Sequence, residues 1–178
     1  MKICISLVIL VLFKALPSVA DPSITAEVYG AEDRFPKIHS LNWLNRNFLD
    51  QQRTRVDDMA RSQFGQQIRG NKTDLHTLQR LIDSNAITVG SDKIALQALG
   101  VVLGDVYAKE IKGLEWQVYE DELGKSHAVC LHKTKNCLFP ITMLSRRLEA
   151  GVKPNVKDIY QKGLAEISPF LPKKPFSQ

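Results

Sequence analysis

The chain has 178 residues, of which 44% are hydrophobic and 24% charged, with 24 Lys and Arg against 19 Asp and Glu. This length suffices for one domain with a real hydrophobic core and is too short for two comfortable ones. The net charge of +5 is modest and mixed in sign along most of the chain, which argues against a nucleic-acid partner.

Residues 1–20 have the layout of a secretory signal peptide. Lys2 forms a minimal basic region, residues 3–13 form an apolar core, and the small residues Ser18 and Ala20 stand at positions −3 and −1 of a cleavage site. The core is shorter than the roughly 20 apolar residues that span a bilayer. An uncleaved membrane anchor is the alternative. We expect cleavage after Ala20, a periplasmic or secreted protein, and no stable membrane insertion after cleavage.

Cleavage would also change the charge of the protein. It removes Lys2 and Lys14 and no acidic residue, so the basic residues fall from 24 to 22 against 19 acidic ones and the net charge falls to +3. The high isoelectric point is therefore weak support for nucleic-acid binding. After the signal we expect an exposed leader over residues 21–38, a single domain over 39–168 and a flexible Pro/Lys tail over 169–178.

The first predicted helix begins after Ser40, a plausible N-cap residue. Apolar residues then recur at helical spacing, at Leu41, Leu44, Phe48, Val56, Met59, Ala60 and Phe64. The stretch 50–55 between them is wholly polar. The pattern fits one long amphipathic helix to about Gly65, or two helices with a break near Thr54.

Two further helices follow. Thr73 and Asp74 form the expected cap of the second, whose apolar stripe is Leu75, Leu78, Leu81 and Ile82. Residues 94–111 form the most apolar helix, which we expect in the core. Gly100 and Gly104 stand four apart on it, and each costs about 1 kcal/mol relative to Ala in a helix interior. Another element must approach this face closely, and the predicted sheet is the simplest candidate.

After Gly113 the apolar period changes from helical to two, which predicts an antiparallel meander of three strands. The strands cover about residues 116–119, 127–132 and 137–139. Two helices close the domain. Thr142 is the expected cap of the first, and Asn155 with Asp158 three residues later opens the second. The sequence thus predicts an α+β fold, with a helical N-terminal half, the Gly-rich helix packed on the sheet, and two closing helices.

Cys130 and Cys137 are the only cysteines left after cleavage, and an even pair in an exported protein indicates a disulfide. The turn between them places the two on neighbouring strands, within bridging range. The alternative is zinc, because His127 and His132 would complete a set of four ligands. Their spacing matches no zinc-finger pattern, and thiols in an oxidising compartment pair with each other. We expect no metal or other cofactor.

No nucleophile elbow, metalloprotease helix or phosphate-binding loop is present in the sequence, so we predict no catalytic residues. The candidate binding surface combines Arg146 and Arg147, which suit an anionic partner, with Glu120 and Asp121 of a predicted hairpin turn. The ordinary interpretation of these residues is a solvated surface, with one arginine paired to Glu149 or to the acidic turn.

Several spaced motifs in the C-terminal half resemble the bacterial family called domain of unknown function 3806, DUF3806. They are LGVVLGD at 99–105, Trp116, EDELG at 120–124 and FPITMLSRRLEAG at 139–151. The resemblance covers about residues 75–165. It implies a compact bacterial domain and brings no activity, cofactor or catalytic residue. The cysteine pair and the long first helix are not part of it.

Three functions remain open. The first is a non-enzymatic, exported envelope protein that binds another protein, for example as an immunity or inhibitor protein. The second is a small periplasmic hydrolase that uses His127 or His132 with an acidic turn residue. The third is a structural protein at the envelope surface that meets anionic lipid or glycan through Arg146, Arg147 and the lysines at 173 and 174. The sequence does not define an oligomeric state.

Overall fold

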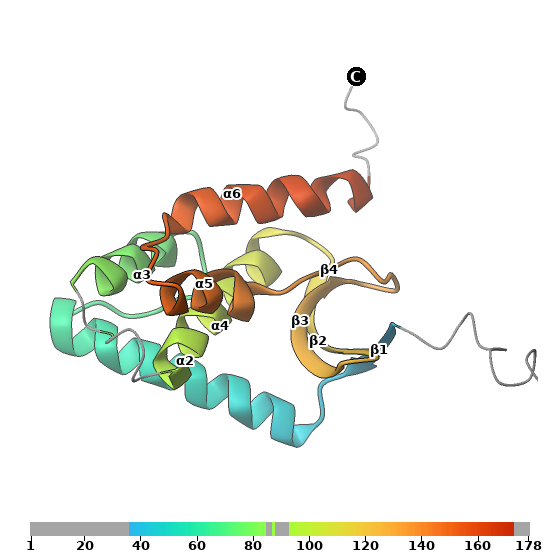
Figure 1. Cartoon of the computed structure of the whole chain (residues 1–178), viewed down its shortest axis with the longest axis horizontal. Helices are drawn as coiled ribbons and strands as arrows, with labels where there is room; N and C mark the ends of the chain where they lie inside the picture. The colour runs from blue at the N-terminus through green and yellow to red at the C-terminus, as the bar shows by residue number, and fades with distance from the viewer. Residues whose placement is uncertain (1–35, 85–86, 88–92, 173–178) are drawn as a thin grey trace, which may run out of the picture. The chain divides into compact units, whose positions relative to one another are not determined.

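A computed structural model of the chain describes residues 36–84, 87 and 93–172 (Figure 1). Over these residues it contains five α-helices and a four-stranded antiparallel sheet, which confirms the predicted α+β class. The predicted signal peptide, most of the leader and the lysines of the tail lie outside the described residues. The elements are β1 (Lys37–Ser40), α2 (Trp43–Phe64), α3 (Thr73–Asp83), α4 (Lys93–Glu110), β2 (Leu114–Asp121), β3 (Gly124–Leu131), β4 (Cys137–Leu138), α5 (Pro140–Glu149), α6 (Val156–Ile167) and the 3-10 turn η1 (Ser168–Phe170).

Helix α4 is the centre of the core. It contacts each of the other four described α-helices and also strands β2 and β3. In Figure 1, α2 and α6 flank the pair formed by α4 and α5. The buried residues of α4 cover nearly its whole circumference: Ala95, Leu96, Ala98, Leu99, Gly100, Val101, Val102, Leu103, Gly104, Val106 and Tyr107. A helix that is apolar all round is buried, so this is the predicted core helix.

The two glycines of α4 meet two different elements. A Cβ atom on Gly104 would lie 2.1 Å from Cζ2 of Trp116, so the bare helix surface receives this indole ring from β2. A Cβ atom on Gly100 would lie 2.3 Å from the Cα atom of Ile141, in the first turn of α5. The close approach predicted from the sequence is therefore shared between the sheet and a helix.

The sheet has the strand order β1-β2-β3-β4, with every neighbouring pair antiparallel. The sequence predicted three of these strands, and the fourth, β1, begins within the expected leader. It pairs Lys37 with Glu120 and Ser40 with Gln117 of β2. Four residues with one apolar side chain are too short a pattern to predict a strand, and β1 forms because β2 offers a free edge.

Helix α2 is one continuous helix of 22 residues, which decides between the two predicted alternatives. Its N-cap is Asn42, whose side chain accepts a hydrogen bond from the backbone N–H of Asn45 at 2.9 Å. The predicted cap, Ser40, is wrong because Ser40 belongs to β1. The helix ends at Gly65, whose φ of 63° is the left-handed conformation that glycine adopts without strain.

The two closing helices also begin at identifiable residues. Helix α5 begins at Pro140 rather than after Thr142, since proline is favoured at the first helical position, where its missing N–H costs nothing. Helix α6 begins after Asn155, whose side chain accepts from the N–H of Asp158 at 3.1 Å, as predicted.

Tyr107 fixes the place of α6 on the core. Its buried hydroxyl donates to the backbone carbonyls of Ile159 and Tyr160, at 3.0 and 3.1 Å. Gly163 makes room for it, because a Cβ atom there would lie 2.2 Å from the Tyr107 oxygen. Burial raises the pKa of Tyr107, so the hydroxyl remains a donor at any physiological pH.

Asp105 connects three elements through one carboxylate. Arg53 of α2 donates to this carboxylate from Nε and from Nη2, both at 2.7 Å. Trp116 of β2 donates to it from Nε1 at 2.8 Å. The hydrogen bond with Asp105 is the main cause that raises the pKa of the Arg53 guanidinium. A bidentate Arg–carboxylate pair is among the stronger side-chain interactions, so this joint fixes the rotation of α4 against α2 and the sheet.

We predict that Gly100→Ala destabilises the protein by about 1 to 3 kcal/mol, as overpacking does in a tight core, although alanine favours helices. The neighbour of the new methyl group is the α5 backbone, which cannot rotate away. Urea unfolding followed by circular dichroism measures the change.

The control for this variant is Ala165→Gly, at an exposed position of α6. It loses only the helix propensity of alanine, about 1 kcal/mol. A Gly100→Ala protein as stable as the wild type or more stable would contradict the close approach of α5.

Candidate functional site

A groove of about 650 Å³ runs between α3 and α6, and it is the candidate site. The residues of α3 that line it are spaced as one face of a helix, and the residues of α6 likewise. The opposite face of α3, with Leu78 and Leu81, is buried in the core. The lining residues are Lys72, Leu75, His76, Gln79, Asp83, Lys153, Pro154, Asn155, Lys157, Tyr160 and Gln161.

Gln79 holds the two walls of the groove together. Its side-chain oxygen accepts a hydrogen bond from the backbone N–H of Val156 at 2.8 Å, in the first turn of α6. Its amide nitrogen donates to Asp83 at 3.1 Å, one turn further along α3. Because the first N–H groups of a helix have no partner within the helix, this bond both caps α6 and sets its distance from α3.

Tyr160 contributes a buried side chain to the groove lining. The residue is 2% exposed, and its ring stacks on that of Tyr107 with the centroids 5.0 Å apart. Unlike Tyr107, its hydroxyl makes no hydrogen bond within the described part of the chain. Burial is the main cause that raises its pKa; Lys72 opposes this rise and Glu110 adds to it. The hydroxyl is therefore protonated and available as a donor.

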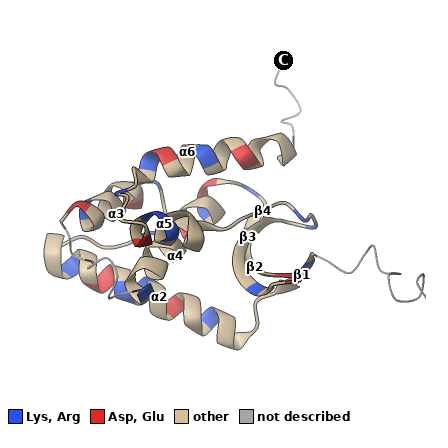
Figure 2. Cartoon of the chain, in the orientation of Figure 1, with Lys and Arg blue, Asp and Glu red and all other residues tan. Residues whose placement is uncertain are grey.

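Positive charge prevails at the groove. Lys72, Lys153 and Lys157 line it, with Asp83 as the one carboxylate of the lining set. Lys72 also approaches Glu110, with Nζ 3.5 Å from Oε2. Lys153 and Lys157 are exposed and form no ion pair with the described residues. Figure 2 shows that charges of both signs are otherwise spread over the helices.

The residues of the predicted binding surface lie on separate elements. Arg146 and Arg147 are exposed on α5 and line a second cavity, of about 480 Å³. Glu120 lies on β2, with its Oε2 atom 2.6 Å from Nε2 of His39. The Asp121 carboxylate accepts hydrogen bonds from two backbone N–H groups of the β2–β3 turn. No ion pair joins the arginines to the acidic turn or to Glu149 among the described residues. A binding role for these residues stays a prediction.

The two histidines of the hydrolase hypothesis have different surroundings. His127 stacks on Phe48, with ring centroids 4.9 Å apart, and its Nε2 lies 2.9 Å from the Asn45 side-chain oxygen. Its partner is thus an amide rather than an acidic turn residue. His132 lies on the surface with Nδ1 2.9 Å from Glu115, a strand residue of β2. The acidic turn residue Glu120 instead pairs with His39, which the hypothesis did not name.

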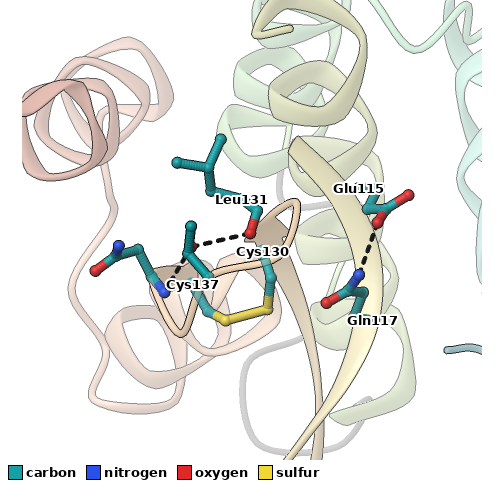
Figure 3. Close-up of a disulfide and its surroundings, with 7 residues drawn as sticks. Glu115, Gln117, Cys130, Leu131 and Cys137 are labelled. Carbon is teal, nitrogen blue, oxygen red and sulfur yellow. Dashed lines mark hydrogen bonds between the residues drawn. A yellow bond between two sulfur atoms is a disulfide. The ribbon is translucent and has the colours of Figure 1, made fainter. Parts of the chain in front are cut away.

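Cys130 and Cys137 are joined in a disulfide between β3 and β4, as the turn between their strands predicts (Figure 3). In the disulfide neither cysteine has the thiolate that would bind zinc with the neighbouring histidines. Across the described residues, no group of three or more His, Cys, Asp and Glu side chains gathers at metal-binding distance. In the same residues, no helix has the length and apolar character needed to cross a bilayer.

A known family of domains matches the part of the chain that forms the groove. The family model described as "Domain of unknown function (DUF3806)" matches residues 74–160, which confirms the resemblance predicted from the sequence. The matched segment begins in α3 and ends at Tyr160, so it contains most of both walls of the groove. No curated protein matches the chain.

One solved structure supports the fold. A crystal structure from Bacteroides thetaiotaomicron VPI-5482 superimposes with a TM-score of 0.65 at 18% sequence identity. The match covers 72% of this chain and 47% of that one, so this chain spans about half the length of its structural neighbour. At this identity the likeness shows the fold alone.

We predict that reduction of the disulfide destabilises the protein by about 2 to 3 kcal/mol, the value expected from the chain entropy of so short a loop. Urea unfolding with and without dithiothreitol measures the effect. In the double variant Cys130→Ala/Cys137→Ala, the reductant should change nothing. Equal stability of the oxidised and reduced wild type would contradict a stabilising role for the bridge.

Acidification should destabilise the protein through His127, because burial lowers the pKa of this imidazole in the folded state. The unfolded chain then binds the proton more readily. The contribution of His127 to stability is complete above pH of about 6.5, the unfolded value, and is lost as the pH falls through the lower folded pKa.

His127→Gln tests this pH dependence, since it retains a side-chain amide donor for Asn45 and has no titrating group. Urea unfolding at several pH values between 7 and 5 should give a smaller loss of stability for the variant than for the wild type. The same slope in both proteins would contradict the burial of a neutral imidazole.

Proposed function

We propose that the protein is an exported, non-enzymatic protein of the bacterial envelope that binds another protein through the groove between α3 and α6. An immunity or inhibitor protein that neutralises its partner is one form of this function. The observation that carries the proposal is the groove itself, where the hydroxyl of Tyr160 and the ammonium groups of Lys153 and Lys157 have no partner among the described residues. A hydroxyl donor at the surface of a groove, with no acceptor among the described residues, is available to a ligand.

Export is supported by the sequence of residues 1–20 and agrees with the chemistry of the domain. Stable disulfides are typical of oxidising compartments such as the periplasm and are rare in the cytosol. The bridge between Cys130 and Cys137 suits the exported state.

The size and the chemistry of the groove suit the binding of a partner. Its volume lies within the roughly 300–1,000 Å³ that is typical of ligand pockets. Burial raises the pKa of Tyr160, so its hydroxyl keeps its proton near neutral pH and acts as a hydrogen-bond donor. Lys153 and Lys157 supply fixed positive charge at the rim. These groups can hold and orient a partner.

Site-specific photocrosslinking in living cells tests the function. A photoreactive phenylalanine analogue replaces Gln161, an exposed residue of the groove wall, in the full-length chain expressed in its native bacterium. We expect one discrete covalent adduct in the periplasmic fraction, with a processed chain that begins at Asp21. The partner is identified by mass spectrometry, purified and mixed with the mature protein, and the two should form a stoichiometric complex.

The matched control places the same analogue at Lys135, an exposed residue of the β3–β4 turn outside the groove. This position should give no adduct with the same partner. Absence of any adduct from Gln161, or identical adducts from both positions, would contradict binding through the groove. An unprocessed chain that stays in the cytoplasm would contradict export.

A further inference from the structure

The groove combines an apolar wall with an excess of positive charge. Leu75, Pro154 and the ring of Tyr160 provide apolar surface, while three lysines and one aspartate supply the charge. Lys72 is partly neutralised by Glu110. The other two lysines, Lys153 and Lys157, carry two positive charges against the one negative charge of Asp83, so the net charge that remains is about +1. This balance suits a single carboxylate better than a multiply charged phosphate group.

The Tyr160 hydroxyl is suited to bind such a carboxylate. It is a protonated donor with no acceptor in the described part of the chain, and it reaches the groove surface although the residue as a whole is 2% exposed. A hydrogen bond from a neutral donor to a charged acceptor is stronger than a bond between neutral groups. Lys72 lies near enough to Tyr160 to influence its titration, so the hydroxyl and a lysine act on the same region of the groove.

Carboxamide side chains complete the lining. Gln79 and Asn155 are engaged in capping α6, whereas Gln161 makes no hydrogen bond with the described residues. A carboxamide offers both a donor and an acceptor, which is the pair of groups that a peptide main chain presents. A lipid chain or a simple organic acid does not present this pair of a backbone donor and a backbone acceptor. The lining therefore fits an extended peptide segment with an acidic side chain next to an apolar one.

We propose that the α3–α6 groove binds an acidic peptide segment of the partner protein. Its carboxylate accepts a hydrogen bond from Tyr160 in a groove that Lys153 and Lys157 make positive, while a neighbouring apolar side chain packs on Leu75 and Pro154. This inference specifies the partner chemistry of the proposed function and depends on it for the identity of the ligand as a protein. Binding should weaken with ionic strength, because the lysines are exposed to solvent.

A selection from a random peptide library against the mature protein tests the proposal. We expect the enriched peptides to share an acidic residue beside an apolar residue. The affinity of the best peptide is then compared, by fluorescence anisotropy, with that of its analogue in which glutamine or asparagine replaces the acidic residue. The neutral analogue should bind about tenfold more weakly, as expected for the loss of a charge-assisted hydrogen bond.

Two variants locate the binding site. Tyr160→Phe should weaken binding of the acidic peptide about tenfold and leave the unfolding midpoint unchanged, because the hydroxyl has no partner in the described structure. Lys153→Gln/Lys157→Gln changes only exposed side chains and should reduce the preference for the acidic peptide over its neutral analogue. The control Lys135→Gln removes a lysine outside the groove and should leave both affinities unchanged.

Enriched peptides without a shared acidic residue would overturn the proposal, and so would equal affinities of the acidic and neutral peptides. Wild-type affinity of the two groove variants would also overturn it, because the peptide would then bind elsewhere. The two proposals fail separately. A crosslinked partner with no preference for acidic peptides contradicts only the ligand chemistry, whereas acidic peptides that bind a groove with no cellular adduct contradict only the protein-binding function.

Discussion

The fold depends on one carboxylate, that of Asp105, which accepts hydrogen bonds from α2 and from β2 at the same time. Asp105 follows Gly104, the residue on which the indole of Trp116 lies. The bare glycine surface allows the ring to approach the helix, and the approach brings the indole N–H to the carboxylate. Because the same joint sets the rotation of α4, it also directs Tyr107, two residues further on, towards α6.

The groove follows from this arrangement. Tyr107 and Gly163 fix α6 against the core, and Gln79 fixes the start of α6 against α3. Stacking on Tyr107 then leaves the ring of Tyr160 in the groove lining, with its hydroxyl unused by the described residues. Residues in the core thus determine the width and the chemistry of a surface site, although they do not line it.

Local patterns predicted most of the fold. The buried glycine-rich helix, the hairpin strands and the Asn155 cap follow from spacing over a few residues. The Arg53–Asp105 pair joins residues 52 apart, and Gln79 meets α6 across 77 residues, so no local pattern reveals them. Tyr160 is one of the buried residues of α6, and only the packing of α6 beside α3 makes it part of the groove lining. Strand β1 depends likewise on the edge that β2 offers.

The most direct test of this account is the free energy of unfolding of Asp105→Asn. The amide can still accept from Trp116 but places a donor against Arg53, so we expect a loss of about 2 to 3 kcal/mol. This is at or below the lower end of the range of about 3 to 5 kcal/mol for breaking a buried pair, because Arg53 is 34% exposed. Asp50→Asn removes the other carboxylate partner of Arg53, at a side chain 69% exposed, and should cost less than about 0.5 kcal/mol. Equal effects of the two substitutions would contradict the central role of Asp105.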